Sequence, residues 1–164
     1  MKNTIQLEVY EVMKLLIQRV QQASVEIDSE VVGSIDRGFM VLFGACENDN
    51  TVIADKMLKK LAGLRIFEDE NGKTNLSLND VGGQILLVSQ FTLYADCKKG
   101  NRPSFSRSGD PKKANELYEY SVSKLRSEYG FDVKTGQFGA DMKVSLINDG
   151  PFTIILDSDE IIGS

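Results

Sequence analysis

The residues best suited to chemistry lie where an apolar run breaks into polar side chains. Residues 85–88 (ILLV) have the pattern of a buried β-strand. Four residues with polar or aromatic side chains follow directly: Ser89, Gln90, Phe91 and Thr92. Hydroxyl and amide groups at a strand end can orient a reacting group, but they are also ordinary hydrogen-bonding residues there. This segment alone therefore marks a candidate site without defining a reaction.

A positively charged segment comes next. Residues 98–113 contain six cations and one acid, Asp110. The cations are Lys98, Lys99, Arg102, Arg107, Lys112 and Lys113. The whole chain carries a net charge of −5, so a local basic patch would bind phosphates in one place only. From charge alone, a solvated loop is an equal alternative.

A second unusual segment, residues 148–151 (Asn-Asp-Gly-Pro), interrupts an apolar run near the C-terminal end of the sequence. Because proline cannot donate a hydrogen bond to a sheet, the chain there must lie at an edge, a bulge or a turn. One interpretation is a reverse turn with a trans Gly150–Pro151 bond. The other is a rigid corner that presents backbone carbonyls to a ligand. Residue types alone do not decide between them.

The composition excludes several catalytic routes. The chain has no histidine, which removes Ser-His-Asp and Cys-His catalysis and histidine-ligated metals. Its two cysteines, Cys46 and Cys97, are far apart, so neither a disulfide framework nor a zinc site is expected. Any hydrolysis must use another route, and we expect no metal and no cofactor.

The length and the hydropathy predict one domain. A chain of 164 residues can bury a core of its own, and no apolar run is long enough to span a bilayer. The first twelve residues carry Glu8 and Glu11 and lack the apolar core of a signal peptide. We therefore expect a cytoplasmic protein without a membrane partner.

The first half of the chain is predicted to open with short strands. Four segments have strand patterns: 14–20, 23–28, 31–35 and 39–44. Arg19 is an unusual charge within the first of them. Residues 36–38 (Asp-Arg-Gly) are predicted to form the turn between the last two, which gives an antiparallel meander.

Two amphipathic helices are predicted. The first is capped by Asp49 or Asn50, and its apolar stripe is Ala54, Met57, Leu58, Leu61 and Leu64. The second has Asp110 as its cap and Pro111 in its first turn. Its predicted buried face is Ala114, Leu117, Tyr118, Val122 and Leu125. Residues 131–157 then form two or three strands, so the fold class is α+β.

Taken together, the motifs resemble the D-aminoacyl-tRNA deacylase family. The segments that carry the resemblance are 89–93 (SQFTL), 95–96 (AD), 99–105 (KGNRPSF) and 148–153 (NDGPFT), supported by 17–20 (IQRV), 65–67 (RIF) and 136–142. They occur in family order from about Met13 to Leu156. The resemblance implies an N-terminal extension (1–12), a single deacylase domain (13–157) and an acidic tail (158–164). It also implies mainly antiparallel strands in a curved sheet or barrel-like core with two main helices.

The resemblance implies hydrolysis of the ester that joins a D-amino acid, or glycine, to the 3′ end of a tRNA. It implies a homodimer whose active sites lie at the subunit interface, with the segment 89–92 of one subunit facing Gly150 and Pro151 of the other. In the family this Gly-Pro bond is cis, and its carbonyls hold the α-amino group and exclude an L side chain. Such backbone recognition suits a site that must accept any D side chain.

The other predicted roles also come from this resemblance. Arg19 is expected to support the Gly-Pro corner by bonding nearby carbonyls, with an ordinary salt bridge as the alternative. Asn148 is a second supporting residue, and Met142 lines either the pocket wall or the core. The cations expected to bind tRNA phosphates are Lys98, Lys99, Arg102 and Arg107.

For the chemical step, Thr92 has no recognisable base to activate its hydroxyl. We therefore expect water to attack the ester, with help from the neighbouring ribose hydroxyl of the substrate. Backbone N–H groups around Phe91 and Thr92 would stabilise the oxyanion. Ser89 and Gln90 would position the substrate, and Phe91 would stack on the terminal adenine or else belong to the core. Two alternatives stay open: a tRNA-binding module without catalysis, and an esterase with Thr92 as its nucleophile.

Overall fold

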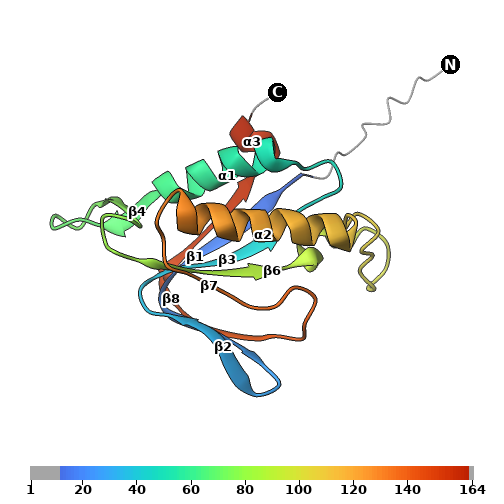
Figure 1. Ribbon diagram of the computed structural model, residues 1–164, viewed down its shortest axis with the longest axis horizontal. Coiled ribbons are helices and arrows are strands. Elements are labelled where there is room, and N and C mark those ends of the chain that lie inside the picture. Colours follow the sequence, from blue (N-terminus) through green and yellow to red (C-terminus); the bar gives the residue numbers. More distant parts are fainter. Residues whose placement is uncertain (1–11, 163–164) are drawn as a thin grey trace.

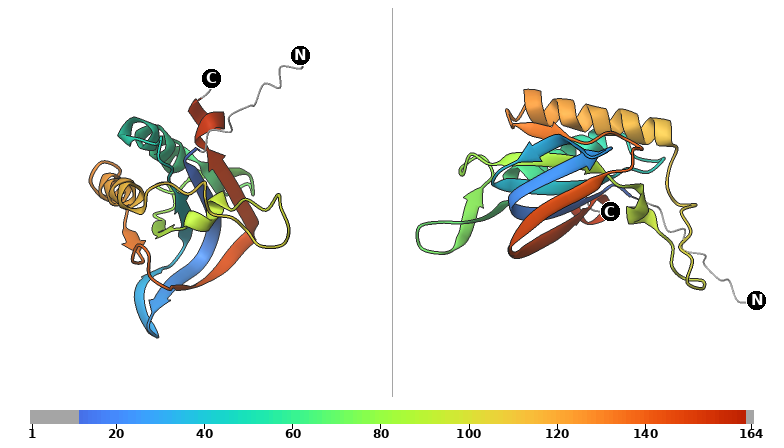
Figure 2. Two further views of the ribbon diagram at one scale, coloured as in Figure 1. Left: turned by 90° about the vertical axis from the view of Figure 1, so that its right-hand side faces the viewer. Right: turned by 90° about the horizontal axis from the view of Figure 1, so that it is seen from below.

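A curved six-stranded sheet with two long helices on one face forms the centre of the molecule (Figures 1 and 2). The computed structural model describes residues 12–162. The strands of the sheet are β1 (Lys14–Ile27), β2 (Glu30–Ile35), β3 (Gly38–Gly44), β6 (Gln84–Ser89), β7 (Val133–Thr135) and β8 (Lys143–Asp157). A separate hairpin contains β4 (Arg65–Glu68) and β5 (Thr74–Ser77). The predicted α+β class is confirmed.

Strand β1 is paired along both of its edges. On one edge, Ala23 lies opposite Ile35 of β2 and Val20 lies opposite Gly38 of β3. The register is the same across both pairs, so β2 and β3 continue one another along β1. The predicted meander is therefore wrong: residues 36–37 interrupt a long strand, and the chain does not reverse there.

The other edge of β1 is occupied by β8, which runs antiparallel to it from Lys143 to Asp157. The residues 148–151 lie within this strand, so of the two interpretations left open by residue type, the reverse turn does not apply. The register shifts near Val20, which marks an irregularity in the ladder at the proline-containing segment. Among residues 12–162, β8 pairs only with β1, so the proline lies on an edge strand, where its missing donor is tolerated.

Strands β6 and β7 extend the sheet from β3 in parallel. Parallel neighbours need crossover connections, and helices α1 (Thr51–Gly63) and α2 (Pro111–Ser127) lie within these two connections. The sheet curls until β7 approaches β2, where the backbone of Gly33 leaves no room for a side chain. A Cβ on Gly33 would lie 2.7 Å from the carbonyl oxygen of Thr135. The strands are mainly antiparallel and form a nearly closed barrel, as predicted.

Both predicted helices are confirmed, and their caps explain where they begin. The side chain of Asn50 accepts a hydrogen bond from the Ile53 N–H (3.0 Å), so Asn50 is the cap of α1. Asp49 is instead buried and accepts bonds from the N–H groups of Cys46 (2.6 Å) and Met13 (3.2 Å). Asp110 caps α2 as predicted, with Lys112 as the donor (3.2 Å).

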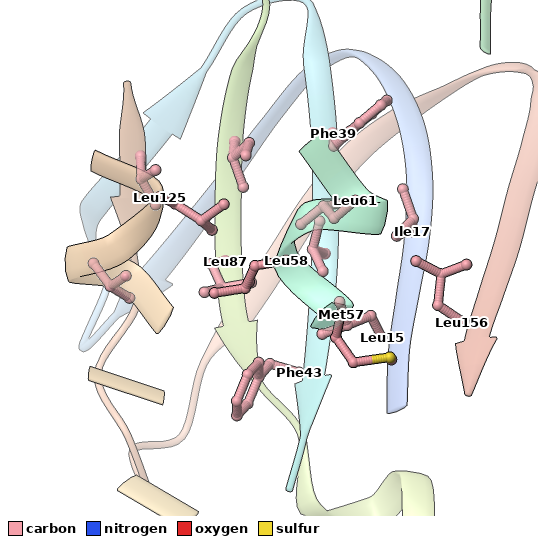
Figure 3. Packing of buried hydrophobic residues seen from close by; sticks show 14 of the residues in the cluster. Leu15, Ile17, Phe39, Phe43, Met57, Leu58, Leu61, Leu87, Leu125 and Leu156 are labelled. Carbon is pink, nitrogen blue, oxygen red and sulfur yellow. The ribbon is translucent and has the colours of Figure 1, made fainter. Parts of the chain in front are cut away.

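The hydrophobic core lies between the sheet and these helices (Figure 3). Met57, Leu58 and Leu61 of α1 are fully buried against Leu15 and Ile17 of β1 and their neighbours. The predicted stripe of α1 is thus confirmed, with Leu64 only half-buried at the helix end. On α2, four of the five predicted positions are buried and the fifth, Ala114, is half-buried.

The two ends of the described chain meet. The N–H of Ser158 donates to the carbonyl of Met13 (3.0 Å), and both residues are buried. The described part of the predicted acidic tail forms a short helix, α3 (Ser158–Ile162), beside α1. Of the predicted N-terminal extension, residues 1–11 lie outside the described residues. No helix within residues 12–162 is long and apolar enough to cross a membrane.

The closure of the sheet at Gly33 predicts a large cost for a very small side chain. Gly33→Ala must push β2 away from β7, because the new methyl group would collide with backbone. We expect the free energy of unfolding to fall by about 1–3 kcal/mol, as in overpacked cores. Urea denaturation followed by circular dichroism measures this change.

The matched control is Gly63→Ala in α1, where a Cβ meets no atom within 4 Å. That substitution should leave stability unchanged or raise it by up to about 1 kcal/mol. Equal unfolding midpoints for Gly33→Ala and the wild type would contradict the tight closure.

Candidate active site

A pocket of about 280 Å³ lies at the end of β6, next to the predicted catalytic segment. Ser89 is the last residue of β6, and the chain then enters the short helix η1 (Phe91–Tyr94). Ser89, Gln90 and Phe91 line one side of the pocket. Phe138 and Met142, from the loop between β7 and β8, line another side. Three of the four predicted catalytic residues therefore border one cavity with Met142.

Helix η1 provides hydrogen-bond donors next to this pocket. The turn is held by Gln90, whose N–H donates to the carbonyl of Phe43 (2.8 Å) and whose carbonyl accepts from Leu93 (3.3 Å). Phe91 and Thr92 are the first residues of η1, and N–H groups at a helix start have no acceptor within the helix. Two backbone donors can thus be offered to a developing negative charge.

The hydroxyl of Thr92 is exposed and accepts a hydrogen bond from the side-chain amide of Gln90. An amide is no base, so this contact orients the hydroxyl without activating it. The nearby Tyr94 is buried and donates its hydroxyl to the carbonyl of Val12 (2.8 Å). Burial raises the pKa of Tyr94 far above its usual value of 10.0, so this phenol stays protonated. The arrangement therefore fits attack by water better than attack by Thr92.

The basic segment forms a closed loop beyond η1. Asp96 and Ser104 exchange two backbone hydrogen bonds of 2.7 and 2.9 Å, which close the loop at its base. Arg107 forms an ion pair with Asp96 (3.3 Å). A backbone bond from Lys98, followed by the charges of Arg107 and nearby lysines, lowers the pKa of Asp96. Arg107 thus lies at the base of the loop.

The other cations predicted to bind tRNA are at the tip of this loop. Lys98, Lys99 and Arg102 are all exposed. The loop extends beyond the end of the sheet, near the start of α2 (Figures 1 and 2). A flexible polyanion can therefore reach these three side chains from solvent.

The Gly-Pro corner lies in β8 and is held by two polar side chains. The Gly150–Pro151 bond is cis. Arg19 is buried and donates to the carbonyls of Asp149 (2.9 Å) and Ile66 (2.6 Å). Its guanidinium also lies over the Phe152 ring, 4.7 Å from the centroid. Arg19 therefore ties the corner to β4.

Asn148 fastens the corner from within the strand. Its amide donates to the carbonyls of Arg19 (3.0 Å) and Phe152 (2.9 Å), and its oxygen accepts from the Phe152 N–H (3.2 Å). The residues before and after the Gly-Pro bond are thus bridged by one side chain. Gly150 and Pro151 themselves are exposed.

The predicted site residues fall into two groups within one chain. Asn148 lies opposite Val20 of β1, Val20 lies opposite Gly38 of β3, and Gly38 lies opposite Gln84 at the start of β6. These four residues therefore form one row across the sheet. Ser89 lies at the far end of the same strand, five residues or about 16 Å away along it. The Gly-Pro corner and the pocket are therefore separate from one another within one chain.

Sequence reasoning missed part of the pocket. Ala114 of α2, Phe138 and the backbone of Gly139 and Ala140 line it, although none was predicted as a site residue. Ala114 had been assigned to the helix core because it matches the apolar spacing. The loop 136–142 was noticed only as a supporting motif, and its residue types resemble those of an ordinary connection.

Comparison with known proteins identifies the family of this chain. A family model described as D-Tyr-tRNA(Tyr) deacylase matches residues 16–157, which include both groups of site residues. This chain belongs to that deacylase family.

The relatives of this deacylase-family chain match it over almost their full lengths. A D-aminoacyl-tRNA deacylase from Lactobacillus gasseri is 59% identical over 145 residues, which cover 88% of this chain and 99% of the relative. A protein of the same name from Thermosipho melanesiensis is 51% identical over 149 residues, covering 91% of this chain and 99% of the relative.

Two solved structures have the same fold as this deacylase-family chain. A c-Myc DNA unwinding element binding protein is 39% identical, with a TM-score of 0.80 over 87% of this chain and 97% of that chain. A probable eukaryotic D-amino acid tRNA deacylase is 19% identical, with a TM-score of 0.77 over 89% of this chain and 99% of that chain. The second likeness concerns the fold alone.

The contacts of Arg19 predict that lysine cannot replace it in this deacylase-family chain. A lysine keeps the charge, but its single ammonium cannot replace Nε and Nη1 at two separate carbonyls. We expect Arg19→Lys to lower the free energy of unfolding by about 1–3 kcal/mol, the cost of leaving a buried acceptor unpaired. Arg102→Lys, at an exposed position in the basic loop, serves as the control and should change stability by about 0.5 kcal/mol or less. Equal losses in the two variants would contradict the bracing role of Arg19.

Proposed function

We propose that this protein hydrolyses the ester bond of D-aminoacyl-tRNA and releases the free D-amino acid and the tRNA. The observation that carries the proposal is the family match over residues 16–157, which spans the pocket, the corner and the basic loop. Relatives that match along 99% of their length are named D-aminoacyl-tRNA deacylases. The activity places the enzyme in the cytoplasm, where tRNAs are charged.

The terminal adenosine of the tRNA enters the pocket at the end of β6. Apolar walls from Phe138 and Met142 suit a nucleobase, and Phe91 at the rim supplies a further ring face. The side chains of Ser89 and Gln90 lie where a ribose or an ester carbonyl would be positioned. The ester then lies beside the first turn of η1.

Water carries out the chemical step. Its oxygen bonds to the ester carbonyl carbon, and the N–H groups of Phe91 and Thr92 stabilise the oxyanion that forms. The bond to the ribose oxygen then breaks, and that oxygen takes the proton which the water lost. The neighbouring ribose hydroxyl of the substrate assists this transfer. Aminoacyl esters are already reactive, so orientation and oxyanion stabilisation provide enough catalysis.

A second copy of the chain completes the site. The corner is about 16 Å along the sheet from the pocket in one subunit, so its Gly150 and Pro151 carbonyls must act on the substrate held by a partner. Strand β8 exposes the large apolar side chains Val144, Ile147 and Ile155, which supports a homodimer formed through this edge.

Chirality is read at the corner supplied by the partner. Two backbone carbonyls hold the α-amino group, and the rigid backbone fills the space that an L side chain would need. Glycine has no side chain to exclude and is therefore also accepted. Arg19 and Asn148 keep this corner rigid through the bonds described above.

Phosphates of the acceptor stem are bound by the basic loop. Lys98, Lys99 and Arg102 provide contacts that depend on salt and carry little base information, which suits an enzyme that serves many tRNAs. A module that only binds tRNA would need this loop alone, whereas the pocket and the corner support catalysis.

Replacing Thr92 distinguishes direct attack by water from a covalent threonine mechanism. If water attacks the ester directly, Thr92→Val should keep kcat within about tenfold of the wild type, since no covalent step is lost. Single-turnover hydrolysis of D-tyrosyl-tRNA measures this rate. Trapping of an acyl group on Thr92, with loss of all activity in the variant, would establish a threonine esterase in place of the water mechanism.

The decisive experiment compares D- and L-tyrosyl-tRNA as substrates for the wild type and for Gly150→Ala. Gly150 has a φ of +141°, and a Cβ there would lie 3.0 Å from Nη2 of Arg19 and 3.1 Å from the Phe152 nitrogen. The corner must therefore shift, and a displacement of about 1 Å can cost about 100-fold in rate. We expect rapid hydrolysis of the D-ester only, and its loss in the variant.

Gly63→Ala provides the matched control, since its methyl group points into open space. Equal hydrolysis of both esters by the wild type would indicate a general esterase. Hydrolysis of neither ester, with tRNA still bound, would leave a tRNA-binding module as the function.

A further inference from the structure

We propose that Phe91 and Phe105 form a stacking platform for the unpaired nucleotide that precedes the terminal adenosine of the substrate. This inference rests on the proposed function, because it assumes that a tRNA 3′ end enters the pocket. It assigns a role to Phe105 and gives Phe91 a second contact beyond the pocket rim.

The two rings form an exposed pair. Their centroids are 5.3 Å apart at an interplanar angle of 68°, an edge-to-face arrangement. Phe91 is 58% exposed and Phe105 is 39% exposed. Of the large apolar side chains that are exposed within residues 12–162, these two are the aromatic ones. An edge-to-face pair leaves at least one ring face open to a third planar group.

The backbone holds the pair in place. The hydroxyl of Ser108 donates to the carbonyl of Phe91 (3.3 Å), and the N–H of Ser108 donates to the carbonyl of Phe105 (3.0 Å). One residue thus links both aromatic positions. The two hydrogen bonds between Asp96 and Ser104 fix the chain just before Phe105. A platform that is already ordered loses little freedom when a ligand stacks on it.

The charge around the pair identifies the partner as a single-stranded nucleic acid. Lys98, Lys99 and Arg102 extend from the loop that leads to Phe105, and all three are exposed. Aromatic rings beside a cationic loop are the combination that binds unpaired nucleotides, with bases stacked and phosphates neutralised. A protein partner would be expected to use apolar contacts in place of this concentration of cations.

The position of the pair fixes which nucleotide it binds. Phe91 borders the pocket, whereas Phe105 packs on Phe91 and is not part of the pocket lining. A pocket of about 280 Å³ has room for about one nucleoside, so the preceding base must lie outside. The next aromatic surface that it meets is this pair.

The test compares three esters of D-tyrosine: with adenosine, with the trinucleotide CCA, and with the full tRNA. We expect the wild type to hydrolyse the CCA ester with a kcat/KM at least about fivefold above that of the adenosine ester, the lower range of one base–aromatic stack. Phe105→Ala should abolish this gain and leave the adenosine ester unaffected. Phe105→Trp should retain it, whereas Phe105→Leu, which keeps an apolar contact with Phe91, should not.

Three outcomes would overturn the inference. One is a CCA ester that reacts no faster than the adenosine ester in the wild type. Another is an equal loss on both esters in Phe105→Ala, which would make Phe105 a support for Phe91 only. The third is dissociation of an otherwise dimeric enzyme by Phe105→Ala in sedimentation, which would assign the pair to the subunit interface. Failure of the wild type on all three esters would refute the proposed function itself.

Discussion

The double pairing of β1 is the constraint on which the rest of the structure depends. Hydrogen bonds run along both edges of this strand, to β2 and β3 on one edge and to β8 on the other. The edge shared with β3 leads through β6 to the pocket, and the edge shared with β8 leads to the Gly-Pro corner. One strand therefore separates the two groups of functional residues by a fixed distance. Within one chain, the pocket and the corner are therefore held apart.

The segment 98–113 concentrates positive charge on a chain whose net charge is −5. An overall negative charge discourages indiscriminate binding of nucleic acids, while the loop after η1 offers its cations to solvent. Arg19 has a different role, because it is buried and satisfies backbone carbonyls. The exposed cations are thus accessible to a polyanion, whereas the buried one binds backbone carbonyls.

Local patterns in the sequence predicted both helices and the central strand β6, while long-range pairing was beyond them, and the predicted strands 14–20 and 23–28 are in fact one strand, β1. The stripe of α1, the cap at Asp110 and the buried run of β6 are local signals, and all three are present in the structure. Asp49 and Asn50 are equally good helix caps by residue type. The structure distinguishes them, because Asp49 is buried and accepts a hydrogen bond from the Met13 N–H. The assumed turn at residues 36–38 was wrong because three polar or small residues can equally interrupt one long strand. The distance between the corner and the pocket depends on strand order, which no local pattern contains.

The meeting of β1 with β8 has a consequence for the synthesis of the protein. Residues 14–26 pair with residues 143–157, so β1 is synthesised long before its partner strand β8. Contacts between such distant segments slow folding, because a long stretch of chain must be ordered before they form. Until β8 leaves the ribosome, one edge of β1 offers unpaired backbone groups to any other strand nearby. The nascent chain is thus vulnerable to aggregation until β8 has been made.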